Sequence, residues 1–117
     1  MLSELEIDLR GAPPLVTMDL RGEMTTFVQE SLMRTYQQAL ARGATNVLLN
    51  FREVGYLNSA GIAAIIGLIG EARKTNQRIL LTGLTPHYQV VFDMMGLTAF
   101  APLFESEEAA RAAIESS

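Results

Sequence analysis

Residues 47–70 read VLLNFREVGYLNSAGIAAIIGLIG, and the fold class can be inferred by starting from this segment. Its first part, residues 47–51, is almost wholly apolar, which is typical of a strand buried on both faces of a parallel sheet. Residues 52–57 are more polar, and we expect them to form a loop. Over residues 59–75 apolar side chains recur at helical spacing and predict a helix. A buried strand followed by an apolar helix is the repeating unit of α/β folds with parallel strands.

Two further strands are predicted on the N-terminal side of this unit. Leu5, Ile7 and Leu9 alternate with charged residues, which is the period-two pattern of a half-buried strand. Residues 11–14, Gly-Ala-Pro-Pro, interrupt that pattern as a turn, and a second strand follows over residues 15–21. Because the connection is so short, the two strands should pair antiparallel as a hairpin.

A helix is predicted between the hairpin and the segment quoted above. Thr25 and Thr26 are residue types that favour the N-cap position, and from Phe27 onward apolar residues recur at helical spacing. Gly43 is a typical residue for the end of a helix. We therefore expect a helix that begins after the two threonines and ends just before Gly43.

The C-terminal part of the chain continues the alternation of strands and helices. A strand is predicted over residues 78–81. Thr85 and Pro86 then mark the start of a helix, with Thr as the N-cap and Pro at the first helical position. A short apolar stretch, residues 97–104, leads to a last helix with Ser106 as its N-cap.

The predicted order is β-β-α-β-α-β-α-(β)-α, which we interpret as one α/β domain over residues 1–117. A hairpin followed by right-handed crossovers predicts a central mixed sheet, made of the N-terminal hairpin plus parallel strands and flanked by about four helices. A length of 117 residues fits one domain of about 100–200 residues. We expect side chains of the apolar helix to share one core with side chains of the strands: Ile65, Ile66, Ile69, Val47, Leu49 and Leu80.

The composition argues against several classes of function. The chain has no cysteine, which removes disulfide scaffolds, zinc–thiolate sites, iron–sulfur clusters and thiol nucleophiles. The net charge of −4 argues against nucleic acid as a partner, because nucleic-acid binding usually requires a basic surface. The longest uncharged apolar run, residues 60–70, is too short for direct membrane insertion, since a spanning helix needs about 20 residues. With no secretion signal visible, we expect a cytoplasmic protein.

The low content of charge points to a surface that meets a partner. Only 19% of the residues are charged, against about 25% in typical domains, while 49% are hydrophobic. A chain of this composition must either bury the excess apolar area or present part of it to another molecule. Residues 60–70 carry no charge at all and are the main candidate for such a face.

No catalytic constellation can be assembled from the sequence. The single histidine, His87, stands at a predicted helix start, where a surface or capping role is expected. Asp19 and Asp93 fall in the middle of predicted elements rather than in a metal-binding cluster at strand ends. Phosphate-binding loops and dinucleotide fingerprints are also missing from the sequence. We therefore expect no enzyme activity, no metal site and no cofactor.

The informative residues are Asn58 and Ser59, at the start of the apolar helix. Either side chain could serve as the N-cap. A helix N-terminus also tolerates a phosphate, because its free N–H groups and positive dipole end face the anion. A phosphate on Ser59 would place about −1.5 to −2 charges at the edge of an uncharged apolar surface and would repel a partner docked there. From the residues alone, Ser59 is either a cap or a regulated phosphoacceptor.

The chain resembles STAS domains of the anti-sigma factor antagonist family almost from end to end. Residues 20–24, LRGEM, are similar to the family's x-G-E-[LI]-D segment. Residues 58–62, NSAGI, resemble its D-S-[ST]-G-[LI] motif, whose first serine is phosphorylated in the family. Residues 80–86, 90–97 and 104–109 resemble the family's C-terminal pattern in the same order and spacing.

The resemblance implies a regulatory protein that acts by partner switching. The unphosphorylated antagonist would bind an anti-sigma factor that is also a serine kinase, and so release the sigma factor. Phosphorylation would break that complex, and a phosphatase would restore it. By position Ser59 is the candidate phosphoacceptor, and the partner-binding residues are Asn58, Ser59, Gly61, Ile62 and Thr25. The protein is expected to act as a monomer or a weak homodimer.

Three positions depart from the family pattern. Asn58 and Thr25 stand where the family has acidic residues beside the serine, and Ala60 replaces a second hydroxyl residue, so Ser59 is the one hydroxyl of the motif. The missing acids leave open a second interpretation, a STAS accessory subunit of a membrane transporter of the phospholipid-trafficking ABC type. Such a subunit would have the same fold and would not need phosphorylation.

Overall fold

The computed structural model describes residues 5–116, and it has the predicted order of elements. The order is confirmed from the hairpin to the last helix, including the short strand near the C-terminus. The elements are β1 (Glu6–Ala12), β2 (Leu15–Met24), α1 (Val28–Ala41), β3 (Asn46–Leu57), α2 (Ser59–Lys74), β4 (Arg78–Thr82), α3 (Pro86–Met94), the 3-10 helix η1 (Leu97–Ala99), β5 (Leu103–Phe104) and α4 (Glu107–Glu115).

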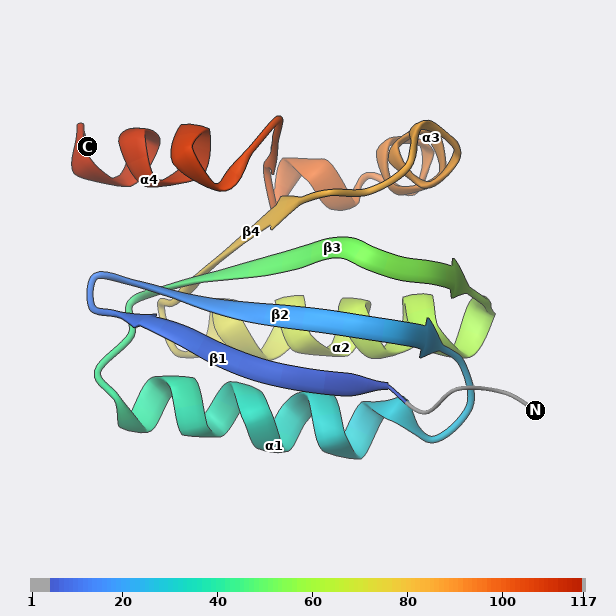
Figure 1. The fold of residues 1–117 in the computed structure, drawn as a ribbon, viewed down its shortest axis with the longest axis horizontal. Helices are drawn as coiled ribbons and strands as arrows, with labels where there is room; N and C mark the ends of the chain where they lie inside the picture. The colour runs from blue at the N-terminus through green and yellow to red at the C-terminus, as the bar shows by residue number, and fades with distance from the viewer. Residues whose placement is uncertain (1–4, 117) are drawn as a thin grey trace.

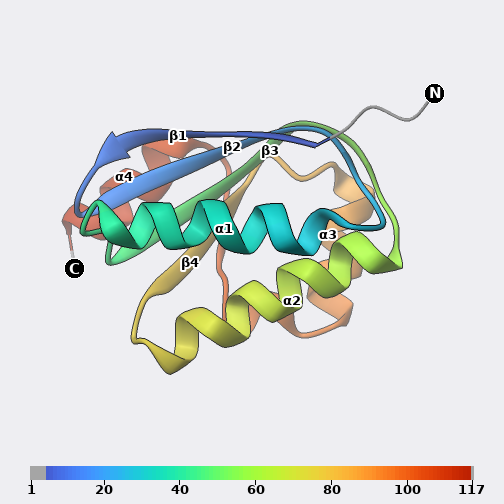
Figure 2. The same cartoon turned by 90° about the horizontal axis from the view of Figure 1, so that it is seen from below.

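The five strands form one mixed sheet in the order β1-β2-β3-β4-β5 (Figure 1). β1 and β2 pair antiparallel, as predicted for the hairpin, and the remaining neighbours pair parallel. α1 and α2 cover one face of the sheet, and α4 lies on the opposite face (Figure 2). Within residues 5–116 no helix combines the length and the apolar character needed to cross a bilayer.

The structure corrects the predicted end of the central strand. β3 extends to Leu57, so residues 52–57 are a strand and not a loop. The extension pairs with the end of β2 through two register shifts, and Met24 is opposite Leu57. Because of these irregularities the buried residues Phe51, Val54 and Leu57 are spaced three apart. The period-two pattern that identifies a strand in a sequence is therefore absent here.

The start of α1 also differs from the prediction. Neither threonine caps the helix, because the residue before it is Phe27, with φ 71° and ψ 11° and no side-chain capping bond. The predicted end is confirmed. Gly43 has a φ of 91°, and its N–H donates to the carbonyl of Leu40 at 2.9 Å, as in a helix that closes with a left-handed residue.

Most of the predicted core is found between the sheet and α2, with two corrections. Ile65 and Ile69 lie in the main core with Val47 and Leu49. Ile66 is 40% exposed, because it is about 100° around the helix from Ile65 and faces away from the sheet. Leu80 is buried on the other face of the sheet, where it packs with residues of α4: Ala110 and Ile114. β4 is apolar on both faces, so alternation could not tell which face meets which helix.

Candidate partner-docking site

Ser59 is the first residue of α2 and is exposed. Asn58 is the N-cap, with φ −100° and ψ −175°, and its side-chain oxygen accepts a hydrogen bond from the N–H of Gly61 at 3.0 Å. The capping role that the sequence left open between two residues therefore belongs to Asn58. Since the Ser59 hydroxyl is not used to cap the helix, it can be modified without the loss of that bond.

Gly61 holds the start of α2 against the end of β2. A Cβ atom added to Gly61 would lie 2.1 Å from the carbonyl oxygen of Met24, closer than atoms can approach. The N–H of Asn58 also donates to this carbonyl oxygen at 3.1 Å. Gly61 is buried, so it does not itself contact a partner. Its part in the site is to fix the position of the Ser59 segment relative to the end of β2.

Thr25 and Ile62 occupy intermediate positions beside Ser59. Thr25 is half-buried and lines a hollow of about 290 Å³ together with Phe27, just before α1, and residues of α1 and α2: Val28, Gln29, Glu30 and Ala60. Ile62 is also half-buried and packs against the main core. The structure thus brings Thr25 next to the Ser59 segment, although 34 positions separate them in the chain.

The exposed side of α2 beyond Ser59 is apolar. Ala60, Ala63, Ile66 and Gly70 are exposed, and the first charged residue of the helix is Glu71. This arrangement agrees with the expectation that residues 60–70 present part of their apolar character to the outside. A phosphate on Ser59 would lie at one end of this uncharged face.

Phe27 is a residue of this region that the sequence did not identify as part of the site. Its side chain is 93% exposed, and it borders the same hollow as Thr25 and Ala60. In the sequence it marks only the first apolar position of a predicted helix. Its backbone is left-handed, with φ 71°, and the pattern of apolar residues reveals neither this conformation nor the exposure of the ring.

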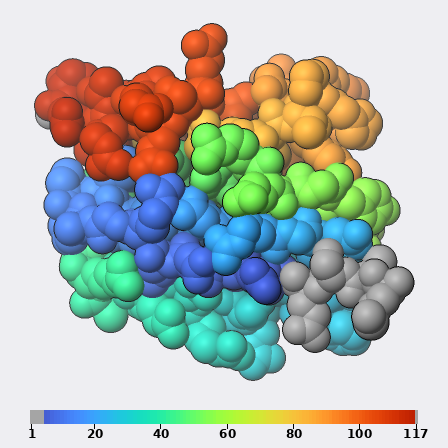
Figure 3. Space-filling view, viewed as in Figure 1, coloured from blue at the N-terminus to red at the C-terminus, as the bar shows by residue number. Residues whose placement is uncertain are grey.

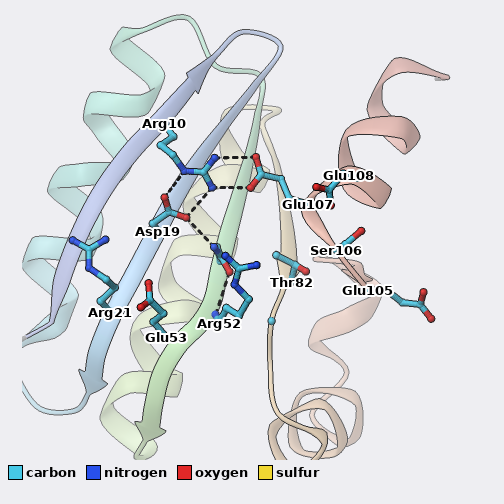
Figure 4. Close-up of a pocket in the computed structure, with 12 residues that line it drawn as sticks. Arg10, Asp19, Arg21, Arg52, Glu53, Thr82, Glu105, Ser106, Glu107 and Glu108 are labelled. Carbon is cyan, nitrogen blue, oxygen red and sulfur yellow. Dashed lines mark hydrogen bonds and ion pairs between the residues drawn. The ribbon is translucent and has the colours of Figure 1, made fainter.

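A second hollow lies on the other side of the sheet and is strongly polar (Figure 4). It has a volume of about 350 Å³. Figure 3 shows α4 in red and α3 in orange as separate bodies above the sheet, with β3 in green between and below them. The side chains around the hollow are mainly charged: Arg10, Asp19, Arg21, Arg52, Glu53, Glu105, Glu107 and Glu108.

Ion pairs occupy much of this polar hollow. Arg10 pairs with Asp19 on β2 and with Glu107 on α4, the latter at 2.7 Å (Figure 4). Hydrogen bonds from Arg10 hold the pKa of both carboxyl groups below their ordinary values. Asn50 donates a further hydrogen bond to Asp19 at 2.8 Å. These contacts join α4 to the sheet and supply Asp19 with its hydrogen-bond partners.

The structure also places His87 and the side chains that could bind a metal ion. His87 is exposed, and its ring contacts the ring of Tyr88 at a centroid distance of 5.0 Å. Among residues 5–116 no group of three or more His, Cys, Asp or Glu side chains is placed to hold a metal ion.

Comparison with known families decides the relationship. The model of the STAS domain matches residues 6–110, which is most of the chain. The chain belongs to the STAS domain family. This assignment agrees with the mixed sheet and the N-terminal hairpin.

Relatives of this STAS domain include proteins named as anti-sigma factor antagonists. The chain is 27% identical over 96 residues to a protein of Bordetella bronchiseptica assigned as the anti-sigma factor antagonist BtrV, with 82% of this chain and 83% of that protein covered. The fold is shared with the anti-sigma factor antagonist SpoIIAA in its unphosphorylated form, at a TM-score of 0.70 and 19% identity, covering 97% and 96% of the two chains. An antagonist from Mycobacterium paratuberculosis has a TM-score of 0.77 at 13% identity, covering 96% and 95%.

Proposed function

We propose that this STAS domain is an anti-sigma factor antagonist that acts in the cytoplasm by partner switching. Unphosphorylated, it binds an anti-sigma factor that is also a serine kinase, and a sigma factor is released. The observation that carries the proposal is Ser59, an exposed serine at the first position of α2 whose hydroxyl is not used as the helix cap. The relatives named above support the same role, since each is described as an antagonist.

The proposed chemistry on this chain is limited to one serine. The Ser59 Oγ forms a bond to the γ-phosphorus of ATP, the bond from that phosphorus to ADP breaks, and the hydroxyl proton passes to a base of the kinase. A phosphatase reverses the change by adding water across the phosphoester. The antagonist supplies the acceptor and a rigid helix start, and the kinase and the phosphatase supply the catalysis. This division of roles agrees with a regulatory protein that is not itself an enzyme.

The phosphate acts as a switch because of where it is placed. The first turn of α2 offers N–H groups without helical partners, so the anion does not disrupt the helix. The apolar face that follows has no charge before Glu71 to balance the phosphate. A partner that covers Ala60 and Ala63 would have to bury the phosphate or leave, and burial of an unpaired charge is strongly unfavourable.

The test is to incubate the purified protein with the candidate kinase and ATP, and to measure phosphate by mass spectrometry and complex formation by calorimetry. We expect one phosphate, on Ser59, and loss of the complex. Ser59→Ala is the matched control, which should keep the complex in the presence of ATP, while Ser59→Asp should weaken it without ATP. If Ser59→Asp binds as tightly as the wild type and no phosphate is found, the switch is wrong.

The same experiment separates the proposed role from that of a transporter subunit. A transporter accessory domain would bind its partner independently of the state of Ser59. The relatives favour the antagonist, because each of the three is named as an anti-sigma factor antagonist.

A further inference from the structure

Phe27 is the most exposed large hydrophobic residue in the part of the chain that the structure describes. Its side chain is 93% exposed, compared with 81% for Met94, the next most exposed. A benzyl group in water is unfavourable, and an apolar side chain this open marks a contact surface when it adjoins other apolar or functional residues.

The backbone conformation of Phe27 is also energetically unfavourable. With φ 71° and ψ 11° it occupies the left-handed region, which is unfavourable for residues with a Cβ and suits Gly or Asn. The side chain makes no capping bond to α1 and its ring is not packed in the core. A glycine would therefore suit this turn better than phenylalanine. The stability of the fold does not explain the phenylalanine, which points to an interaction with another molecule.

Phe27 lies close to the segment that contains Ser59. It lines the hollow of about 290 Å³ whose other wall includes Ala60, the residue after Ser59. α1 and α2 begin at the same end of the molecule (Figure 2). Phe27, just before α1, and Ala60, next to the candidate phosphoacceptor, border one hollow there. Gly67 of α2 and Gln29 of α1 also lie side by side, since a Cβ on Gly67 would be in ordinary contact with the Gln29 side-chain nitrogen at 3.6 Å.

We propose that Phe27 is the anchor residue of the partner interface, and that its ring inserts into an apolar pocket on the anti-sigma factor beside the kinase centre that reaches Ser59. This inference rests on the proposed function and extends it to the residue that gives the complex its affinity. Aromatic side chains that fill a partner's pocket commonly dominate the binding energy of an interface. The net charge of −4 and Glu30 at the rim of the hollow disfavour an anionic membrane as the occupant.

The decisive variant is Phe27→Gly, because it removes the ring and also suits the left-handed backbone. Thermal unfolding should show a stability equal to or above that of the wild type. Affinity should be measured by calorimetry against each purified anti-sigma factor of the serine-kinase type encoded in the source genome. We expect a loss of at least about 30-fold in affinity, as for a hot-spot residue. Met94→Ala, which removes the next most exposed apolar side chain, on α3, should bind as the wild type.

The outcomes distinguish this inference from the proposed function. Weaker binding by both Phe27→Gly and Ser59→Asp, with Met94→Ala unaffected, supports both. Full binding by Phe27→Gly together with weaker binding by Ser59→Asp overturns the anchor and leaves the switch intact. If no kinase of this type binds the wild type, both ideas fail. If the chain instead self-associates through Phe27, as measured by light scattering, or binds anionic phosphatidylglycerol vesicles in a Phe27-dependent way, the anchor is overturned in favour of that occupant.

Discussion

A single missing side chain at Gly61 determines how the Ser59 segment is held. The Cα of this residue lies so close to the carbonyl of Met24 that a methyl group would be 2.1 Å from the oxygen. The clash is with backbone, which cannot rotate away, so α2 or the end of β2 would have to shift. The geometry around Ser59 therefore depends on a glycine that does not itself reach the surface.

Gly61→Ala should destabilise the domain by about 1–3 kcal/mol, the usual cost of overpacking a close contact. The matched control is Gly70→Ala in the same helix, because a Cβ at Gly70 meets nothing within 4 Å. That change should stabilise the domain by about 0.5–1 kcal/mol, since alanine is the better helix former. Urea unfolding of the two variants measures both effects. Equal stabilities for the two would contradict the close approach of α2 to Met24.

Ile65 and Ile66 are neighbours in the sequence with opposite environments. Ile65 is fully buried, whereas Ile66 is 40% exposed on the outer face of α2. Ile65→Ala should lower the free energy of unfolding by about 2–5 kcal/mol through lost burial and the cavity left behind. Ile66→Ala should cost less than about 1 kcal/mol. Denaturant unfolding would show the two variants as equal if the helix were rotated by one residue.

Among the helices and strands, those with regular periodicity were predicted from the sequence, and the irregular part of β3 was not. The hairpin, α2 and the cap of α4 at Ser106 follow from periodicity and local hydrogen bonding, and the structure confirms them, with the Ser106 hydroxyl accepting from the N–H of Ala109 at 3.1 Å. The second half of β3 was missed because register shifts against β2 broke its alternation. Whether strand pairing continues past Phe51 depends on a segment that is distant in the sequence.

The candidate site was likewise predicted only in part. Asn58 and Ser59 could be found because capping is local chemistry and the motif around them resembles a known family. Phe27 could not, because an apolar residue at a helix start is expected to pack inward, and its left-handed backbone is a conformation that the residue type disfavours. Ile66 was placed in the core because a helix with apolar residues on every side does not reveal which side faces the sheet.

The attachment of α4 to the sheet depends on pH through Arg10. The hydrogen bonds of Arg10 lower the pKa of Asp19 and Glu107 in the folded state. In acid the unfolded chain therefore binds these protons first, so the pairs stabilise the fold above the unfolded pKa of about 4. That stabilisation is lost as the pH falls through the lowered folded pKa. Both carboxylates are largely screened from solvent, with side-chain exposures of 16% and 22%.

Arg10→Gln should reduce the fall in stability between about pH 5 and pH 2, because the two carboxyl groups return toward their ordinary pKa. The measurement is the urea midpoint as a function of pH, with carboxyl NMR titration of Asp19 and Glu107. Arg34→Gln is the control, since Arg34 pairs with the exposed Glu30 of α1 and such pairs contribute little. An unchanged pH profile in Arg10→Gln would show that the ion pairs do not couple α4 to the sheet.

In the molecule as a whole, the many apolar residues of this weakly charged chain are partly buried and partly exposed. Much of the apolar excess is in the cores on the two faces of the sheet. Among residues 5–116 the exposed large apolar side chains are Phe27 before α1, Tyr56 near the end of β3, Ile66 in the middle of α2, and a group around α3 and η1 made of Val90, Met94, Met95 and Phe100. Phe27 borders the same hollow as Ala60, next to the candidate phosphoacceptor, whereas the group around α3 and η1 does not line that hollow, so the composition alone could not have selected the docking face.

Phosphorylation of Ser59 should change the surface charge of the molecule without changing its fold. The phosphate adds about −1.5 to −2 charges to a chain whose net charge is −4, at a helix end that favours anions. Ser59→Asp should therefore leave the melting temperature unchanged or slightly higher, whereas Ser59→Lys should lower it, because a cation opposes the same dipole. Amide chemical shifts should move near Asn58, Thr25 and the first turn of α2, and stay constant in α4. The opposite result would be a lower melting temperature in Ser59→Asp together with amide chemical-shift changes spread over the sheet. It would mean that the switch works by destabilising the fold and not by local repulsion of the partner.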